Sequence, residues 1–183
     1  MEPTIETLRT ARLQLRPFVP ADEAALGRMM SDPAVMRQYG GGVTLSPDDV
    51  RRVMEYHLHC RAHDYWAWAI RANDDHRFIG SLTAGMTDFD GQRWFEPAWI
   101  LVHAEWGHGF ATEAARAVVD YALGELRCQR LLATADPLNA ASIRVIEKAG
   151  FQFLRQAEVR PGRPAKVFII STASHNPSSD DRR

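Results

Sequence analysis

The sequence holds few of the features that mark metal-binding, secreted or membrane-spanning proteins. Only two cysteines occur among its 183 residues, and the separation between Cys60 and Cys128 matches no metal-binding or redox motif. We therefore expect two free thiols in a reducing compartment rather than a disulfide. No segment approaches the ~20 consecutive apolar residues of a membrane span, and residues 1–10 lack the apolar segment of a secretory signal. These absences predict a cytoplasmic protein that does not enter a membrane.

Neither sign of charge is in excess. Lys and Arg total 22 and Asp and Glu total 23, which gives a formal net charge of −1. A balanced chain has no general attraction for nucleic acid or anionic membranes, so we expect neither as a partner, although a local basic patch is compatible with this balance. With 45% hydrophobic and 25% charged residues, the composition is that of an ordinary globular protein. The length suits one domain, which we place at residues 1–173, followed by a polar, disordered tail at 174–183.

Hydrophobic spacing predicts a chain that mixes strands and helices. Alternating or β-branched runs predict strands at residues 12–18, 65–70, 78–86, 94–102, 130–135, 151–157 and 165–172. Apolar residues at helical spacing predict helices at 21–30, 46–62, 112–126 and 139–149. The expected fold is α/β of the α+β type: a mixed, mostly antiparallel six- to seven-stranded sheet with about four helices on its faces. Pro97 removes a hydrogen-bond donor from strand 94–102, so we expect a bulge or broken pairing nearby.

The segment from Trp99 to Glu113 is the most informative stretch. An apolar run ends at a turn that contains Gly107 and Gly109, and a helical pattern begins at once. Such glycines permit a tight turn in which several backbone N–H groups converge at the positive end of a helix, a place where phosphate groups bind. Taken alone, the pattern also fits an ordinary tight turn or a dinucleotide-binding loop. The dinucleotide alternative lacks a third glycine and an acidic residue about 20 positions on, and a P-loop is excluded because Gly-Lys-Ser/Thr is absent.

Three motifs in order extend this signal. They are Glu96-Pro-Ala-Trp99 followed by Glu105-Trp-Gly-His-Gly-Phe-Ala-Thr-Glu-Ala114, then Asn139-Ala-Ala-Ser142, then Glu147-Lys-Ala-Gly-Phe151. On these motifs the chain, from about Ala11 to Thr172, resembles the GCN5-related N-acetyltransferase (GNAT) family, and within it the branch of ribosomal-protein N-terminal acetyltransferases. Trp106 stands where the wider family has Gln or Arg, a substitution common in this branch. The resemblance implies the GNAT fold, acetyl-CoA as the acyl donor and no metal.

The resemblance also implies which residues bind acetyl-CoA. Amides of residues 107–112 would hold the pyrophosphate, and the strand backbone at residues 99–101 would pair with the pantetheine arm. The family splays this strand from the next one to admit the cofactor, which is compatible with Pro97, and the Leu101 amide is a candidate donor to the thioester oxygen. The expected cofactor-binding residues are Trp99, Ile100, Leu101, Gly107, His108, Gly109, Phe110, Ala111, Thr112, Asn139 and Ser142.

Two residues are candidates for proton transfer. An amine attacks a thioester only as the free base, and the pKa is ~10.4 for lysine and ~8 for an α-amine, so a base is needed. Glu96 aligns with the strand glutamate that often serves the branch as base, but it also fits a surface glutamate at a strand end. Many family members place a tyrosine acid where this chain has Ile146, so Ser142, alone or with water, is the candidate donor to the leaving thiolate. Asn139 and Ser142 equally fit a helix N-cap and a first-turn residue without a chemical role.

The expected function is an N-acetyltransferase that moves an acetyl group from acetyl-CoA to a primary amine, either a protein N-terminus or a small molecule, by direct attack in a ternary complex. A non-catalytic acyl-CoA-binding or regulatory module is the alternative. We expect a monomer or homodimer. His59 and His63 share a helix face, but no Cys or carboxylate completes a metal site.

The acceptor site is expected across the sheet from the cofactor. The first two helices, the glycine loop at 40–42 and the final hairpin loop would line it. The residues to inspect there are Tyr39, Trp66, Trp68, Trp94, Arg160 and Arg163, although most tryptophans are expected in the core.

Overall fold

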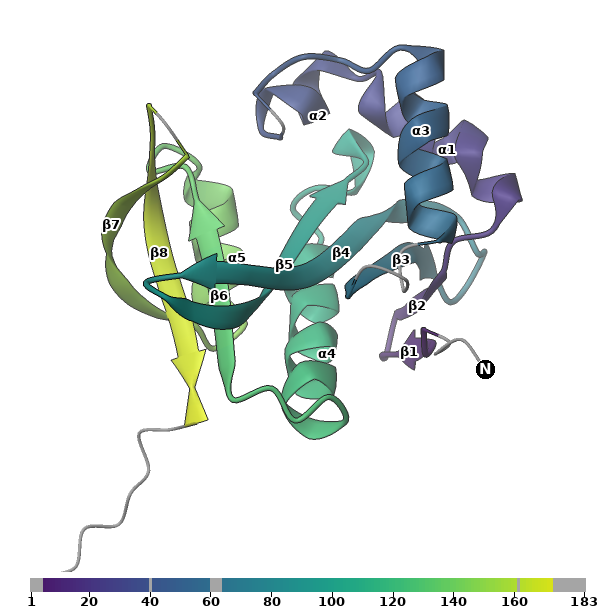
Figure 1. The fold of residues 1–183 in the computed structure, drawn as a ribbon. Helices are drawn as coiled ribbons and strands as arrows, with labels where there is room; N and C mark the ends of the chain where they lie inside the picture. Colours follow the sequence, from purple (N-terminus) through teal and green to yellow (C-terminus); the bar gives the residue numbers. More distant parts are fainter. Residues whose placement is uncertain (1–4, 40, 60–63, 161, 173–183) are drawn as a thin grey trace, which may run out of the picture.

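An eight-stranded sheet forms the centre of the chain (Figure 1). The computed structural model describes residues 5–39, 41–59, 64–160 and 162–172. The strands are β1 Leu8–Arg9, β2 Leu13–Pro17, β3 Tyr65–Ala72, β4 Phe78–Phe89, β5 Gln92–Leu101, β6 Arg130–Ala135, β7 Gln152–Arg160 and β8 Arg163–Ser171. The helices are α1 Glu23–Met30, α2 Pro33–Arg37, α3 Pro47–Leu58, α4 Phe110–Gly124 and α5 Ala140–Lys148. The spatial order is β1-β2-β3-β4-β5-β6-β8-β7, and every neighbouring pair is antiparallel except β5 and β6.

This arrangement confirms the mixed, mostly antiparallel fold class. The sheet has one strand more than expected, because the two-residue β1 is too short to show a periodicity. There is also one helix more, α2. The pair Asp32 and Pro33 ends α1, as the sequence indicates, but the Asp32 carboxylate also accepts the Ala34 amide at 2.8 Å and caps a new short helix.

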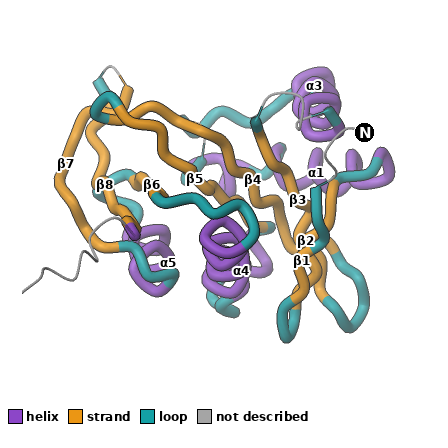
Figure 2. The backbone as a smooth tube through the Cα atoms, turned by 60° about the horizontal axis from the view of Figure 1, so that its bottom comes forward, coloured by secondary structure: helices purple, strands orange, loops and turns teal. Residues whose placement is uncertain are grey.

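Helices cover both faces of the sheet. Figures 1 and 2 show α4 and α5 on one face and α1 and α3 on the other. The apolar stripe of α4 includes Val118 and Ala122, and α1 and α3 bury Leu26 and Met54 on the opposite face. Because both faces are packed, the sheet is a rigid support for the residues at its strand ends.

The sheet opens between its two parallel neighbours. The pairing of β4 with β5 is unbroken from the partners Gly80 and Leu101 to Phe89 and Gln92. In contrast, β5 and β6 are paired only at Phe95 with Leu131, and beyond that point the two strands separate. The expected break in pairing near Pro97 therefore occurs on the β6 side, without a bulge against β4.

Three further sequence expectations concern the C-terminal tail, the two cysteines and membrane-spanning segments. The tail at 174–183 and Cys60 lie outside the described residues, and Cys128 is a free, half-buried thiol. Within the described ranges no helix combines the length and the apolar character needed to cross a bilayer.

Candidate active site

Backbone groups along β5 alternate between its two neighbours. Directly after β5, the Val102 amide donates to the Ile79 carbonyl at 3.0 Å, so even-numbered residues turn their N–H and C=O groups toward β4. The odd-numbered residues Trp99 and Leu101 therefore turn their backbone groups toward the gap beside β6. Pro97 is also odd-numbered, so its missing N–H removes no hydrogen bond to β4. The gap thus presents an open strand edge to which an extended chain can hydrogen bond.

The loop that follows β5 ends in a helix N-terminus with free donors. Gly107 and Gly109 both have φ of 81°, in the left-handed region that favours glycine. Gly109 is the N-cap of α4, and the first helical hydrogen bond runs from the Glu113 amide to the Gly109 carbonyl at 3.1 Å. The amides at residues 109–112 therefore have no acceptor within the helix. A Ser or Asp cap would occupy one of these donors with its own side chain, whereas glycine leaves them for a ligand.

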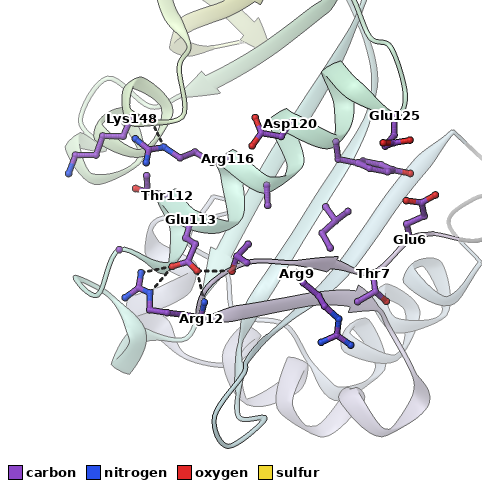
Figure 3. Close-up of a pocket in the computed structure, with 15 residues that line it drawn as sticks. Glu6, Thr7, Arg9, Arg12, Thr112, Glu113, Arg116, Asp120, Glu125 and Lys148 are labelled. Atoms are coloured by element: carbon purple, nitrogen blue, oxygen red, sulfur yellow. Dashed lines mark hydrogen bonds and ion pairs between the residues drawn. The ribbon is translucent and has the colours of Figure 1, made fainter.

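A clamp from the N-terminal segment holds this loop, as Figure 3 shows. The Arg12 guanidinium donates to the Glu113 carboxylate at 2.7 Å and to the His108 carbonyl at 3.0 Å, and it lies 4.6 Å from the Phe110 ring centroid. The Thr10 hydroxyl also donates to Glu113, at 2.6 Å. Burial alone would raise the pKa of the Glu113 carboxyl, but hydrogen bonds from Thr10 and Arg12 lower it below its usual value. The clamp keeps the Glu113 carboxylate ionised and paired with Arg12, and this pairing fixes the start of α4.

Trp106 closes the other end of the loop. Its indole N–H donates to the Leu101 carbonyl at 3.0 Å, and its ring packs against His103 at 4.6 Å between centroids.

Sequence reasoning did not assign positioning roles to Arg12, Glu113 and Trp106. Glu113 and Trp106 lie within the predicted motif, but Arg12 lies about 100 residues away in the sequence, and nothing local pairs it with the loop.

A cavity of about 680 Å³ is lined by the edge of β5, the loop that follows it and the N-terminus of α4. The predicted cofactor-binding residues that line it are Trp99, Ile100, Leu101, Gly107, Gly109, Phe110, Ala111, Thr112, Asn139 and Ser142. Glu96 from β5 and Ala133 and Thr134 from β6 also line it, so the cavity occupies the gap between these strands. His108 does not belong to the lining; its side chain is exposed and its carbonyl accepts the Arg12 hydrogen bond.

Glu96 projects from the face of β5 opposite α4. The Thr134 hydroxyl donates to its carboxylate at 2.9 Å across the gap, and the side chain is half-buried. Ala98 and Ile100 share this face because side chains alternate along a strand. The structure therefore holds the proposed base on the side of the sheet where an acceptor is expected.

The start of α5 supplies the second predicted group. The Asn139 side chain accepts the Ser142 amide at 3.0 Å, which makes Asn139 the N-cap of α5. The half-buried Ser142 lines the cavity, so its hydroxyl is near the gap. Ile146, at the position of the missing tyrosine, is only 1% exposed and belongs to the core.

A second cavity, of about 1000 Å³, lies outside α4 and β1 (Figure 3). It shares Gly109, Thr112 and Lys148 with the first. Its described lining mixes both charges: Arg9, Arg12, Arg116 and Lys148 against Glu6, Glu113, Asp120 and Glu125. Of these two cavities, as the described residues line them, the first combines the open strand edge with the helix N-terminus, so it is the better candidate for an active site.

A third cavity, of about 420 Å³, lies on the α1 and α3 face of β5. Ala98, Ile100 and Tyr39 line both this cavity and the first one, so the two cavities adjoin at these residues. Its described lining comes from α1, α2 and α3, from residues that flank the glycine loop, and from β3, β4 and β5, but not from the final hairpin. Arg163 of that hairpin does reach the glycine loop, where its guanidinium lies next to Gly41.

The other residues predicted for inspection have different surroundings. Trp66 and Trp68 are core residues in edge contact with Phe95 and Tyr121. Trp94 packs in a separate small cluster with Leu132 and Val167. The Arg160 side chain and His63 lie outside the described parts, and among the described residues no group of three or more His, Cys, Asp or Glu side chains could hold a metal.

Sequence comparison finds one family and several relatives. A family model described as an acetyltransferase (GNAT) domain matches residues 12–152. Uncharacterized protein YkkB from Bacillus subtilis (strain 168) is 31% identical over 151 residues, which cover 80% of this chain and 85% of that protein. Uncharacterized N-acetyltransferase p20 from Bacillus licheniformis is 29% identical over 174 residues, which cover 91% of this chain and 96% of that protein.

Solved structures share the fold. An acetyltransferase of the GNAT family from Bacillus anthracis has a TM-score of 0.78 at 23% identity, covering 91% of this chain and 98% of its own. Mycobacterium smegmatis RimJ in complex with CoA-disulfide has a TM-score of 0.74 at 20% identity, covering 97% of this chain and 91% of its own. At these identities the similarity establishes the common architecture.

Proposed function

The chain belongs to the GNAT acetyltransferase family, and from this membership we propose that it transfers an acetyl group from acetyl-CoA directly to a primary amine. One observation carries the proposal: the gap between β5 and β6 leads to a glycine-capped helix whose first amides have no acceptor within the helix. We further propose the ribosomal-protein N-terminal acetyltransferase branch. The sequence motifs support this branch, and RimJ is among the proteins with the same fold.

The donor would lie along the first cavity. The amides at residues 109–112 suit a diphosphate, because oriented N–H groups and the helix dipole both favour negative charge. The backbone of Trp99 suits the amides of a pantetheine arm, since it turns toward the gap, whereas the Leu101 carbonyl already accepts the Trp106 indole N–H at 3.0 Å. Lys148 lines both the first and the second cavity, and Arg116, which lines the second, donates to the Lys148 carbonyl at 2.8 Å; the two side chains supply positive charge for an exposed phosphate. The CoA in the RimJ complex supports coenzyme A as the donor class.

The residues around the gap can then promote the transfer. Glu96, oriented by Thr134, takes the proton of the attacking amine, directly or through water. The nitrogen bonds to the thioester carbonyl carbon while the Leu101 N–H donates to the oxygen that becomes negative. The carbon–sulfur bond breaks, and Ser142, alone or through water, delivers a proton to the leaving thiolate; Glu96 releases the amine proton to solvent and Ser142 regains a proton from solvent, so both residues return to their starting states. The products are an acetamide and the free thiol of CoA.

Direct transfer is favoured over an acetyl-cysteine intermediate. Burial raises the pKa of the Cys128 thiol, and Cys128 does not line the described part of the first cavity. A stable acetyl-cysteine formed on the catalytic path with labelled acetyl-CoA would contradict this mechanism.

The test is acetyl-CoA consumption with a panel of amines that includes peptides, polyamines and small amines. The wild-type protein is expected to acetylate at least one amine. The variants Glu96→Gln and Ser142→Ala are expected to turn over more slowly while binding CoA normally. CoA binding without turnover of any amine would instead favour the non-catalytic acyl-CoA-binding module, which the buried Ile146 at the tyrosine position motivates.

A further inference from the structure

The third cavity has a floor made by two paired strands. Ser81 pairs with Ile100 and Thr83 with Ala98, so these four side chains share the face of the sheet opposite α4. The walls are formed by Met30, Met36, Tyr39, Val43, Leu45, Arg52, Val53, Tyr56, His57 and Tyr65. Because its floor residues Ala98 and Ile100 also line the first cavity, a group bound here would lie close to the proposed site of amine attack.

The cavity suits an uncharged group. Its described lining is mostly apolar and includes no Asp or Glu. The charged member is Arg52, which is 75% exposed and forms an ion pair with Asp49 at 2.9 Å at the edge of the cavity. A polycationic amine would lose its hydration here without meeting a carboxylate, which is unfavourable.

Two buried polar atoms in the lining have no hydrogen-bond partner among the described residues. They are the Ser81 hydroxyl, in a residue 1% exposed, and Nδ1 of His57, in a residue 6% exposed. His57 stacks on Phe18 with 4.7 Å between ring centroids, and burial lowers its pKa to about 4, so the imidazole is neutral at pH 7. Buried polar groups are nearly always paired, so both atoms point to a ligand that supplies hydrogen bonds.

We propose that this cavity selects the acceptor: it holds an uncharged, largely apolar group that carries a hydrogen-bonding atom, such as a phenol, and disfavours polycationic amines. This inference rests on the proposed acetyl transfer, because the cavity is assigned to the acceptor of that reaction. The same chemistry is offered by a small arylalkylamine and by an N-terminal tyrosine.

The experiment compares four amines at pH 8: tyramine, phenethylamine, tyrosine amide and spermidine. We expect kcat/KM to be highest for the two phenolic amines and lowest for spermidine. The ratio of tyramine to tyrosine amide distinguishes a small-molecule acceptor from a peptide N-terminus. Preference for spermidine over every aromatic amine would overturn the proposal.

Two substitutions change residues that line the third cavity. Ser81→Ala removes the unpaired hydroxyl and is expected to lower kcat/KM for tyramine about tenfold, mainly through KM, while leaving phenethylamine unchanged. Val43→Asp places a carboxylate at a site that is 70% exposed and is expected to raise the relative kcat/KM for spermidine. Ser31→Ala, at the exposed end of α1, is the matched control. An equal response of tyramine and phenethylamine to Ser81→Ala would also overturn the proposal.

A binding measurement separates this inference from the proposed function. Calorimetry with the CoA-saturated protein is expected to detect tyramine but not spermidine, and Ser81→Ala is expected to weaken tyramine binding. If this pattern appears without turnover, the cavity assignment stands and acetyl transfer fails. If spermidine is acetylated and tyramine does not bind, acetyl transfer stands and the cavity assignment fails.

Discussion

The conformation of Gly109 gives the sharpest prediction about cofactor binding. An alanine at φ of 81° is strained, and this strain costs about 1–2 kcal/mol in the left-handed region. A Cβ at this position would be 3.5 Å from the Arg12 guanidinium, an ordinary contact, so crowding adds nothing. If the backbone at residue 109 rotates to relieve this strain, the first N–H groups of α4 no longer point toward one common position. We expect Gly109→Ala to lower the free energy of unfolding by about 1–2 kcal/mol.

The effect on CoA binding is expected to be additional. A hydrogen bond to a charged group contributes about 1.5–3 kcal/mol, so loss of one amide contact raises the Kd for CoA by about 30-fold at 2 kcal/mol. Isothermal titration calorimetry measures this change.

The chain provides a matched control in Gly91, which has φ of 71° and an open position with no atom within 4 Å of a Cβ. Gly91→Ala carries the same conformational cost, but it lies in the turn between β4 and β5. We expect its unfolding free energy to fall similarly while its Kd for CoA stays within twofold of wild type. Equal Kd values for the two variants would refute the assignment of the α4 amides to the cofactor.

Three further predictions concern catalysis and stability. Glu96→Gln is expected to lower kcat by about 10²–10⁴-fold with an unchanged Kd for CoA; steady-state kinetics at saturating amine measures this, and an unchanged kcat would remove Glu96 as the base. His57 binds its proton more weakly in the folded protein, with a pKa of about 4, than in the unfolded chain, near 6.5. Its contribution to stability is therefore complete above pH 6.5 and decreases by about 3 kcal/mol as the pH falls to 4. Urea unfolding at pH 7 and pH 4 should show this loss in wild type and a smaller loss in His57→Gln; identical losses would contradict the assignment. Asp22 is fully buried between Arg16 and Arg71, so Asp22→Asn should lower the unfolding free energy by about 3 kcal/mol in urea titration, and a change below 1 kcal/mol would show that the ion pairs are replaceable.

Local patterns in the sequence were sufficient for most of the fold. The seven expected strands and four expected helices are present because each is long enough to show its own periodicity. The strand β1 and helix α2 have two and five residues, and they depend on pairing with β2 and on the Asp32 cap. At the end of the sheet β6 pairs with β8, which does not follow it in the chain, so local spacing contains no information about this neighbour.

The turn between β5 and α4 was more predictable than the contacts that support it. Glycines at 107 and 109 permit the left-handed backbone conformation that the turn adopts, so the turn could be recognised from the sequence. The clamp between Arg12 and Glu113 depends on tertiary contact across the fold. The third cavity combines residues of three helices, three strands and the loop after α2, and its unpaired atoms in Ser81 and His57 become visible only when their surroundings are known.

The central claim is that acetyl-CoA occupies the gap between β5 and β6. A crystal structure of the protein with CoA tests it most directly. We predict hydrogen bonds from the amides at residues 109–112 to the diphosphate, and a pantetheine arm beside Trp99 and Leu101. A CoA whose diphosphate lies in the outer cavity of Figure 3, with the gap between β5 and β6 empty, would contradict the claim.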